Sequence, residues 1–272
     1  MEIKLIACDM DGTLLDSKRR ISERTKKAIA RCVEAGKVFI IATGRMYPAV
    51  IPYAEQLGLD VPIVTYNGGL IRGSKSGKIY LEQPIKLATA QAVLDYVKET
   101  GGYAQYYVGD ELFIKEKNAY SQMYGDLQGI HSVIIPKGEA FYTAYERPYK
   151  ILVMTEAAKM QETLAVYREQ FKGRLDVTSS HPQFIELLEP GVNKWQAICK
   201  LAEQLGFKRE EIMCLGDSDN DYEMVANAGI GVAMANASEK VKSGAKIITA
   251  SNDNDGVAIV LESILTPQAV EE

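Results

Sequence analysis

The chain has 272 residues, of which 47% are hydrophobic, and it carries a formal net charge of -5 with a pI of about 5.3. This length and composition are typical of a globular protein with one large or two modest domains. The acidic balance excludes a surface-wide positive field that would attract nucleic acid or an anionic membrane. A small anionic substrate would therefore need cations placed locally at its site.

The cysteines and the N-terminal sequence bear on the compartment. No C-x-x-C spacing occurs among the cysteines, so they are interpreted as reduced core thiols. They are Cys8, Cys32, Cys199 and Cys214. We see no signal peptide and no stretch that approaches the ~18 apolar residues of a membrane span. We expect a cytoplasmic protein.

The histidines limit the possible chemistry. Only His131 and His181 occur, and both are remote in sequence from the acidic clusters. A histidine-based triad or a multi-histidine metal site is therefore unsupported. The sequence favours carboxylate chemistry.

The first part of the chain predicts alternating strands and helices. Apolar runs predict strands at 3–8, 38–43 and 62–66. A helix is expected after the first strand, with Ser22 as its N-cap and an end near Gly36, and a second helix after the next strand. Strands and helices at this spacing are typical of right-handed βαβ units in a parallel sheet. A hairpin is expected around residues 74–77.

The middle and the last part of the chain differ in pattern. From residue 83 to 187 tyrosines are frequent, and a helix-like stretch is followed by short strand-like runs. After Pro190 the helix and strand alternation returns. Its predicted elements are a helix at 194–205, a strand at 212–216, a helix at 219–227, a strand at 229–235 and a helix at 255–265.

These patterns predict an α/β fold with two domains. A doubly wound, Rossmann-like parallel sheet core is expected from residues 1–82 and 188–272. Residues 83–187 are expected to form an inserted α+β cap that closes over the site and selects the substrate. Both parts have ordinary domain sizes.

Polar residues lie where the predicted parallel strands end. They are Asp9 and Asp11 after the first strand, Thr43, Gly44 and Arg45 after the second, Asn67 after the third, and Asp217, Asp219, Asn220 and Asp221 after the strand at 212–216. The carboxyl ends of such strands converge at one edge of the sheet, where ligands bind. Several carboxylates repel one another there unless a cation joins them, and Mg²⁺ suits a site shared with a phosphate.

Other interpretations of these residues and of the glycine-rich stretches have less support in the sequence. A single acidic cluster can be structural, because Asp caps helices and D-G dipeptides form turns, but two clusters with Thr43 at one edge favour a site. The stretch "DSDNDYEM" lacks the features of a calcium loop, since Tyr222 replaces the required glycine and Ala228 the required acid. "GIGVAM" lacks the third glycine of a dinucleotide site, and no phosphate-binding G-x-x-x-x-G-K-[ST] motif occurs.

Four motifs together resemble those of the haloacid dehalogenase superfamily of phosphohydrolases. They are "DMDGT", "ATGR", "GVNK" and "GDSDNDYEM", in this order along the chain. The insert after the second motif makes the chain similar to the Cof-type branch, whose members act on sugar phosphates and other small phosphorylated metabolites. The resemblance covers residues 1–82 and 188–272, and over the insert it is one of position and length only.

The acids then take candidate roles. An ionised carboxylate held against Mg²⁺ can attack a phosphate ester, and Asp9 is the candidate nucleophile. Asp11 is the candidate acid and base, which protonates the leaving alcohol and then activates the water. The resemblance further implies that the backbone carbonyl of Asp11, the side chain of Asp217 and, directly or through water, Asp221 complete the shell of Mg²⁺, which Asp9 also binds.

The transferring phosphoryl group also needs hydrogen-bond donors. The matching motifs supply Thr43 with Gly44, Lys194 and Asn220. Arg45 either contacts the substrate or pairs with an acid. Asp219 is interpreted as a helix N-cap without a further role. Trp195 stands where the family commonly has glycine, and burial as an anchor of the following helix is favoured over substrate contact.

The sequence thus predicts a Mg²⁺-dependent phosphomonoesterase of small phosphorylated metabolites that works through an aspartyl-phosphate, without a nucleic-acid or membrane partner. One alternative is a phosphomutase, which returns the phosphoryl group to a sugar. Another is a phosphorylation-controlled binding protein similar to bacterial receiver domains, although the long insert argues against it.

Overall fold

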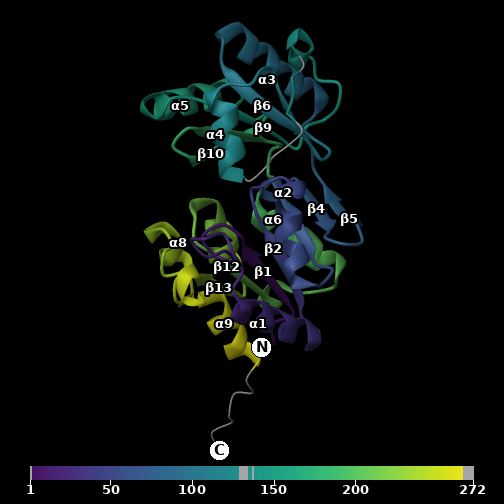
Figure 1. Cartoon of the computed structure of the whole chain (residues 1–272), viewed down its shortest axis with the longest axis vertical. Coiled ribbons are helices and arrows are strands. Elements are labelled where there is room, and N and C mark those ends of the chain that lie inside the picture. Colours follow the sequence, from purple (N-terminus) through teal and green to yellow (C-terminus); the bar gives the residue numbers. More distant parts are fainter. Residues whose placement is uncertain (1, 129–133, 137, 266–272) are drawn as a thin grey trace, which may run out of the picture. The chain divides into compact units, whose positions relative to one another are not determined.

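The structure is a computed structural model that describes residues 2–128, 134–136 and 138–265 (Figure 1). His131 lies outside these residues. The chain divides into two compact units. The first unit comprises Met1–Gly44, Val50–Leu81 and Asn193–Glu272, and the second comprises Arg45–Ala49 and Glu82–Val192. The first unit is thus assembled from segments that the second interrupts.

An eight-stranded sheet forms the first unit, in the order β14-β13-β12-β1-β2-β3-β4-β5 among the described residues. Its strands are β1 (Leu5–Asp9), β2 (Val38–Ala42), β3 (Pro62–Thr65), β4 (Leu70–Gly73), β5 (Ile79–Glu82), β12 (Ile212–Gly216), β13 (Ile230–Ala233) and β14 (Ile247–Ile248). The strands from β14 to β3 pair in parallel, and β4 adds to β3 in the antiparallel direction. β1 is wholly buried, as its continuous apolar run predicts.

The winding direction of this sheet reverses at β1. The chain first adds β2 and β3 on one side of β1, and later adds β12, β13 and β14 on the other. The helices are α1 (Glu23–Glu34), α2 (Tyr47–Ala54), α6 (Lys194–Gln204), α7 (Tyr222–Asn227), α8 (Glu239–Gly244) and α9 (Gly256–Leu265). Because such crossovers are right-handed, the helices that connect the strands of one half cover one face of the sheet and those of the other half cover the opposite face, while the final helix α9 returns to pack against α1, where Glu262 pairs with Arg24 at 2.7 Å. The doubly wound prediction is confirmed, and the reversal at β1 and β12 is where such sheets bind ligands.

Two local predictions need correction. The helix expected at 219–227 is a turn of 3₁₀ helix, η6 (Asp219–Asp221), followed by α7. Asp219 is not its N-cap, because Ser218 holds that position and Asp219 lies inside the turn. The side chain of Asp219 accepts a hydrogen bond from Ser238 Oγ at 2.8 Å. The predicted N-cap of α1 is confirmed, since the Ser22 side chain accepts from the backbone N–H of Thr25.

The second unit is an α+β structure around a six-stranded sheet, in the order β10-β11-β9-β6-β7-β8 among the described residues. Its elements are α3 (Leu87–Thr100), β6 (Tyr103–Val108), β7 (Glu111–Ile114), α4 (Ala119–Gln128), β8 (Ile134–Pro136), β9 (Lys150–Met154), α5 (Met160–Gln170), β10 (Asp176–His181) and β11 (Phe184–Leu188). Residues from α3, α5 and one face of the sheet, such as Val93, Leu164 and Ile151, form its hydrophobic core. Its role in selecting a substrate stays a prediction.

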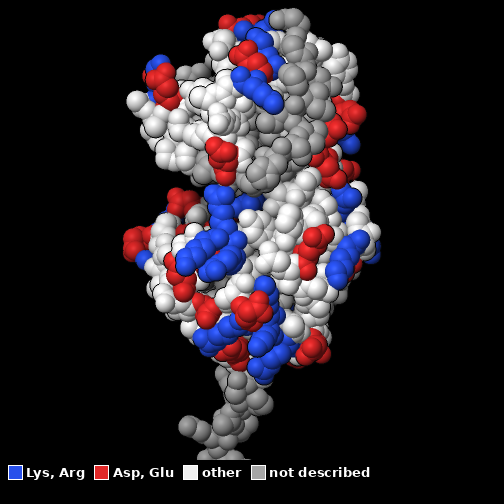
Figure 2. Space-filling model, viewed as in Figure 1, with Lys and Arg blue, Asp and Glu red and all other residues white. Residues whose placement is uncertain are grey.

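Charged residues of both signs are mixed over the visible face of the molecule (Figure 2). This mixture on the visible face fits the small net charge of -5. Within the described part of the chain, every helix is too short or too polar to cross a membrane.

Candidate active site

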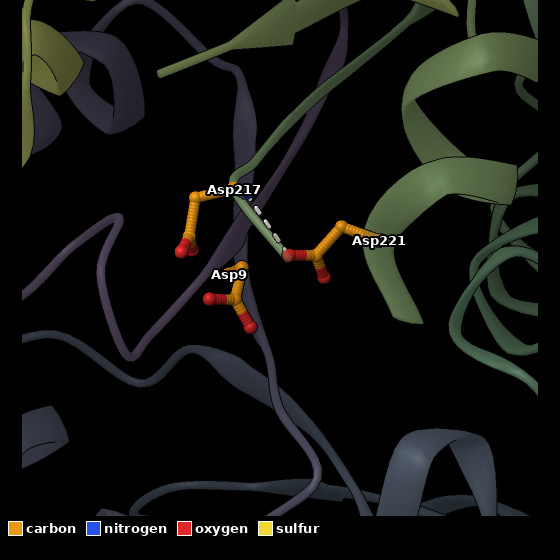
Figure 3. Close-up of side chains that lie close together, drawn as sticks. All are labelled: Asp9, Asp217 and Asp221. Carbon is orange, nitrogen blue, oxygen red and sulfur yellow. Dashed lines mark hydrogen bonds between the residues drawn. The ribbon is translucent and has the colours of Figure 1, made fainter. Parts of the chain in front are cut away.

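Three carboxylates meet at the edge of the first unit's sheet where β1 and β12 end (Figure 3). Asp9 is the last residue of β1, Asp217 directly follows β12, and Asp221 ends η6. Because β1 and β12 are neighbours in parallel register, their ends bring Asp9 and Asp217 together. One oxygen atom of each carboxylate lies within 4.8 Å of the other two. Asp9 and Asp221 are buried, and Asp217 is partly exposed.

Local hydrogen bonds hold the acids in place. The Oδ2 atom of Asp221 accepts hydrogen bonds from the backbone N–H groups of Asp217, at 3.1 Å, and Ser218, at 3.0 Å. These two hydrogen bonds close the turn after β12. Thr13 Oγ1 donates to Asp217 Oδ1 at 2.9 Å from the turn after β1. Gly12 has φ +80°, and a Cβ atom there would lie 2.5 Å from Asp217 Oδ2. A side chain at Gly12 would therefore displace the carboxylate.

Lys194 joins two of the acids. Its Nζ lies 2.5 Å from Asp9 Oδ1 and 2.6 Å from Asp221 Oδ1. The lysine is the first residue of α6, which is capped by Asn193 through a hydrogen bond from the backbone N–H of Gln196. It is 1% exposed, so it is not an ordinary solvated lysine.

Burial and mutual repulsion shift the protonation of the cluster. Burial, followed by the charge of Asp221, holds the pKa of Asp9 well above its usual range, although Lys194 opposes this shift. Burial and the charge of Asp221 raise the pKa of Asp217 to about 6. Burial opposes the charge of Lys194, but Asp221 and Asp9 outweigh burial and raise the pKa of its ammonium group. Burial and the charge of Asp221 therefore disfavour the ionised forms of Asp9 and Asp217.

The cluster has the composition of a site for a divalent cation. Three carboxylates and one ammonium group leave a formal charge of minus two among Asp9, Asp217, Asp221 and Lys194. Carboxylate oxygens are the ligands that hard cations prefer. The raised pKa values of Asp9 and Asp217 also indicate a cation site, because a bound cation would favour the ionised forms of both groups. The residues present therefore fit a divalent metal ion.

The other predicted residues differ in burial and in the unit to which they belong. Asp11 is exposed, and its side chain is not among the three gathered carboxylates. Thr43 follows β2 and is 2% exposed, next to Gly44. Arg45 is also buried, and its contacts place it in the second unit.

Trp195 and Asn220 lie next to cluster residues in the sequence. Trp195 is 8% exposed and contacts Arg209, whose guanidinium lies 5.9 Å from the centre of its ring. Burial of Trp195 agrees with an anchor of α6. Asn220 lies in η6, and its Nδ2 donates to Asn67 Oδ1 at 3.0 Å.

Asn67 is the residue that the sequence analysis noted at the sheet edge without giving it a role. It is 4% exposed and links the end of β3 to Asn220. An asparagine followed by two glycines directly after a predicted strand was the available signal.

Comparison with known proteins identifies the family. Residues 6–261 match the family model of haloacid dehalogenase-like hydrolases. The 5-amino-6-(5-phospho-D-ribitylamino)uracil phosphatase YwtE of Bacillus subtilis (strain 168) is 30% identical over 291 residues, which cover 98% of this chain and 99% of that protein. The phosphatase YitU of the same organism, named for the same substrate, is 31% identical and covers 96% of this chain and 98% of its own length.

Solved structures share the same fold. The crystal structure of a haloacid dehalogenase-like hydrolase from Bacteroides thetaiotaomicron matches with a TM-score of 0.88 and 31% identity, over 97% of this chain and 100% of that one. The sequence resemblance is therefore confirmed. The chain belongs to the haloacid dehalogenase-like hydrolase family, in its Cof-type branch, and its relatives of similar length include enzymes named phosphatases.

Proposed function

We propose that this protein is a Mg²⁺-dependent phosphomonoesterase that hydrolyses small phosphorylated metabolites through an aspartyl-phosphate intermediate. The observation that carries this proposal is the position of Asp9. Its carboxylate lies at the end of β1, gathered with Asp217 and Asp221 and paired with Lys194. A buried carboxylate among cations can attack a phosphorus atom that water attacks slowly.

The metal would be held by the carboxylates of Asp9, Asp217 and Asp221, with the backbone carbonyl of Asp11 as a further ligand. When bound, Mg²⁺ supplies positive charge that screens the repulsion between the Asp9 carboxylate and the anionic phosphate. Lys194 supplies part of this charge from the protein itself, since its Nζ already contacts Asp9 and Asp221.

The chain's own residues perform two displacements. Asp9 attacks phosphorus, the bond to the leaving oxygen breaks, and Asp11 gives its proton to the departing alcohol. Asp11, now a carboxylate, takes a proton from water, which attacks the aspartyl-phosphate and restores Asp9. Donors for the phosphoryl oxygens come from the Thr43 hydroxyl, the Lys194 ammonium group and the Asn220 amide, and Gly44 next to Thr43 is a further phosphate-binding residue.

For the substrate class, we propose phosphate monoesters of sugars and related polyhydroxylated compounds. The two relatives described above are named for a substrate with a phosphorylated ribityl chain, which is such a compound. The inserted residues 83–187 are assigned to selecting among these leaving groups, because the phosphate-binding donors come from the first unit and recognise only the shared phosphate.

The test is phosphate release from a panel of sugar phosphates and 5-amino-6-(5-phospho-D-ribitylamino)uracil, by the full chain with and without Mg²⁺. We expect turnover of at least one compound, lost after chelation and restored by Mg²⁺. Full activity after exhaustive chelation would contradict the metal assignment. Isomerised sugar phosphate in place of free phosphate would instead identify a phosphomutase, and a stable phosphoenzyme without turnover would identify a phosphorylation-controlled binding protein.

A further inference from the structure

The segment after β3 has a backbone conformation that is unusual for its residues. Tyr66 and Asn67 have φ values of 52° and 54°, and Gly68 has φ 116°. Positive φ is uncommon for residues other than glycine, and it is an outlier for a bulky one such as tyrosine. Tyr66 is fully buried and Asn67 is 4% exposed, so this is not a relaxed surface turn. Strain that the surroundings maintain in this way is a reason to look for function.

The backbone of this segment is fixed on two sides. The N–H of Asn67 donates to the carbonyl of Thr43 at 3.1 Å, at the end of β2. A Cβ atom on Gly68 would lie 2.5 Å from the carbonyl oxygen of Asn193, the N-cap of α6. The segment therefore fits closely between the ends of the elements that carry Thr43 and Lys194.

The side chain of Asn67 reaches a third element. Its Oδ1 accepts a hydrogen bond from Nδ2 of Asn220 at 3.0 Å. The same oxygen would lie 2.9 Å from a Cβ atom on Gly44, so only glycine leaves room for it there. Because Oδ1 of Asn67 can only accept, the NH₂ group of Asn220 must face it, and this decides the orientation of the Asn220 amide. One N–H of that amide is then used by Asn67, and the other remains for a ligand.

We propose that Asn67 is a positioning residue that holds the amide of Asn220 in the orientation that donates to the transferring phosphoryl group. This inference rests on the proposed function of the site. Asn67 acts through Asn220 and does not itself touch the substrate. The left-handed backbone of Asn67 lets its N–H donate a hydrogen bond to the carbonyl of Thr43 while its side chain accepts one from Asn220. One residue therefore links the end of β2 to η6.

The test uses Asn67→Gly, because glycine adopts a φ of 54° without strain and removes only the side chain. We expect kcat to fall by roughly tenfold with KM changed by less than about twofold, since the lost hydrogen bond aligns a group that acts in the transition state. Thermal unfolding of the variant should stay close to that of the wild type. Arg19→Gly is the matched control, because Arg19 has a similar φ of 57° on the exposed surface, and it should leave kcat unchanged.

A double-mutant cycle separates positioning from a general structural role. If Asn67 acts through Asn220, then Asn67→Gly should reduce kcat little further in a protein that already carries Asn220→Ala. Isothermal calorimetry with vanadate and Mg²⁺ should show the same non-additive loss of affinity, which gives a measurement independent of turnover.

The outcomes are distinct. Normal kinetics in Asn67→Gly, or additive losses in the cycle, would overturn this inference and leave the proposed function standing. A wild-type protein that neither releases phosphate from any substrate of the panel nor binds vanadate would overturn the proposed function, and this inference with it.

Discussion

The Asp9 carboxylate is the group on which the proposed chemistry depends most. Asp9→Asn keeps the size and burial of the side chain but removes its nucleophilic oxygen. We expect turnover to fall by roughly 10³-fold or more and no phosphoenzyme to form. Phosphate release in a steady-state assay and acid-quenched labelling of the protein measure the two effects.

Asp219→Asn is the matched control for this substitution. Asp219 lies in the same acidic stretch, but it is exposed and is not one of the three gathered carboxylates. Its amide counterpart can still accept the hydrogen bond from Ser238. We expect activity within about twofold of the wild type. Near-normal turnover in Asp9→Asn would show that another group is the nucleophile.

Protonation of Asp217 predicts a pH dependence. Its folded-state pKa of about 6 lies above the ordinary value of 3.8, because of burial and the charge of Asp221. Between about pH 4 and about pH 6, the Asp217 carboxyl group of the metal-free folded protein holds a proton that the same group in the unfolded chain has lost. The contribution of Asp217 to the free energy of unfolding therefore falls as the pH rises through this range. A metal ion replaces that proton, so Mg²⁺ should raise Tm more at about pH 7.5 than at about pH 5.

Thermal unfolding with and without Mg²⁺ at both pH values measures this difference. In Asp217→Asn the increase in Tm should be smaller, and its dependence on pH should be weaker. An equal increase in Tm at both pH values in the wild type would mean that Asp217 does not compete with protons for the metal.

At the scale of elements, the turn after β1 depends on Gly12. Gly12 and Gly36 both have φ +80°, but only a Cβ on Gly12 would meet Asp217, while nothing lies within 4 Å of one on Gly36. Both Gly12→Ala and Gly36→Ala should lower the free energy of unfolding by about 1–2 kcal/mol through backbone strain. Only Gly12→Ala should also weaken Mg²⁺ binding and turnover. Equal activity of the two variants would contradict the close fit of this turn to the acid.

The elements that the sequence predicted well are those with long apolar runs. The strand at 212–216 was predicted with the bounds of β12, and the helix at 194–205 differs from α6 by one residue. The structure adds α8 and β14, which no pattern in the sequence predicts. In α8 only Val241 is buried, and both residues of β14 are exposed, so neither has the apolar periodicity on which prediction relies.

Sequence motifs predicted which acids come together but not how they are paired. Convergence of strand ends follows from topology, so Asp9, Asp217 and Asp221 could be grouped in advance. The ion pairs of Lys194 depend on the position of α6 relative to β1, which no local pattern encodes. The role of Asn67 depends on its positive φ. Sequence patterns rarely indicate a positive φ at a residue other than glycine.

At the scale of the whole molecule, all three carboxylates and Lys194 belong to the first unit. Mg²⁺ binding should therefore slow amide hydrogen exchange mainly in peptides from that unit, because a ligand stabilises the cooperative region that binds it. Peptides from α3, α5 and β9 in the second unit serve as the internal control. Equal slowing in both units would show that they open together as one cooperative structure.

The central position of β1 has a consequence for synthesis on the ribosome. β1 is made before its neighbour β12, and all residues of the second unit lie between these two strands in the chain. Until β12 is made, one edge of this wholly buried strand has no partner to complete its ladder, and open strand edges invite pairing with other chains. Lys194 and Asp221 also arrive late, so the nascent protein carries Asp9 but cannot yet perform chemistry with it. Translation of this protein should thus expose an unpaired, inactive half-sheet that a chaperone can recognise.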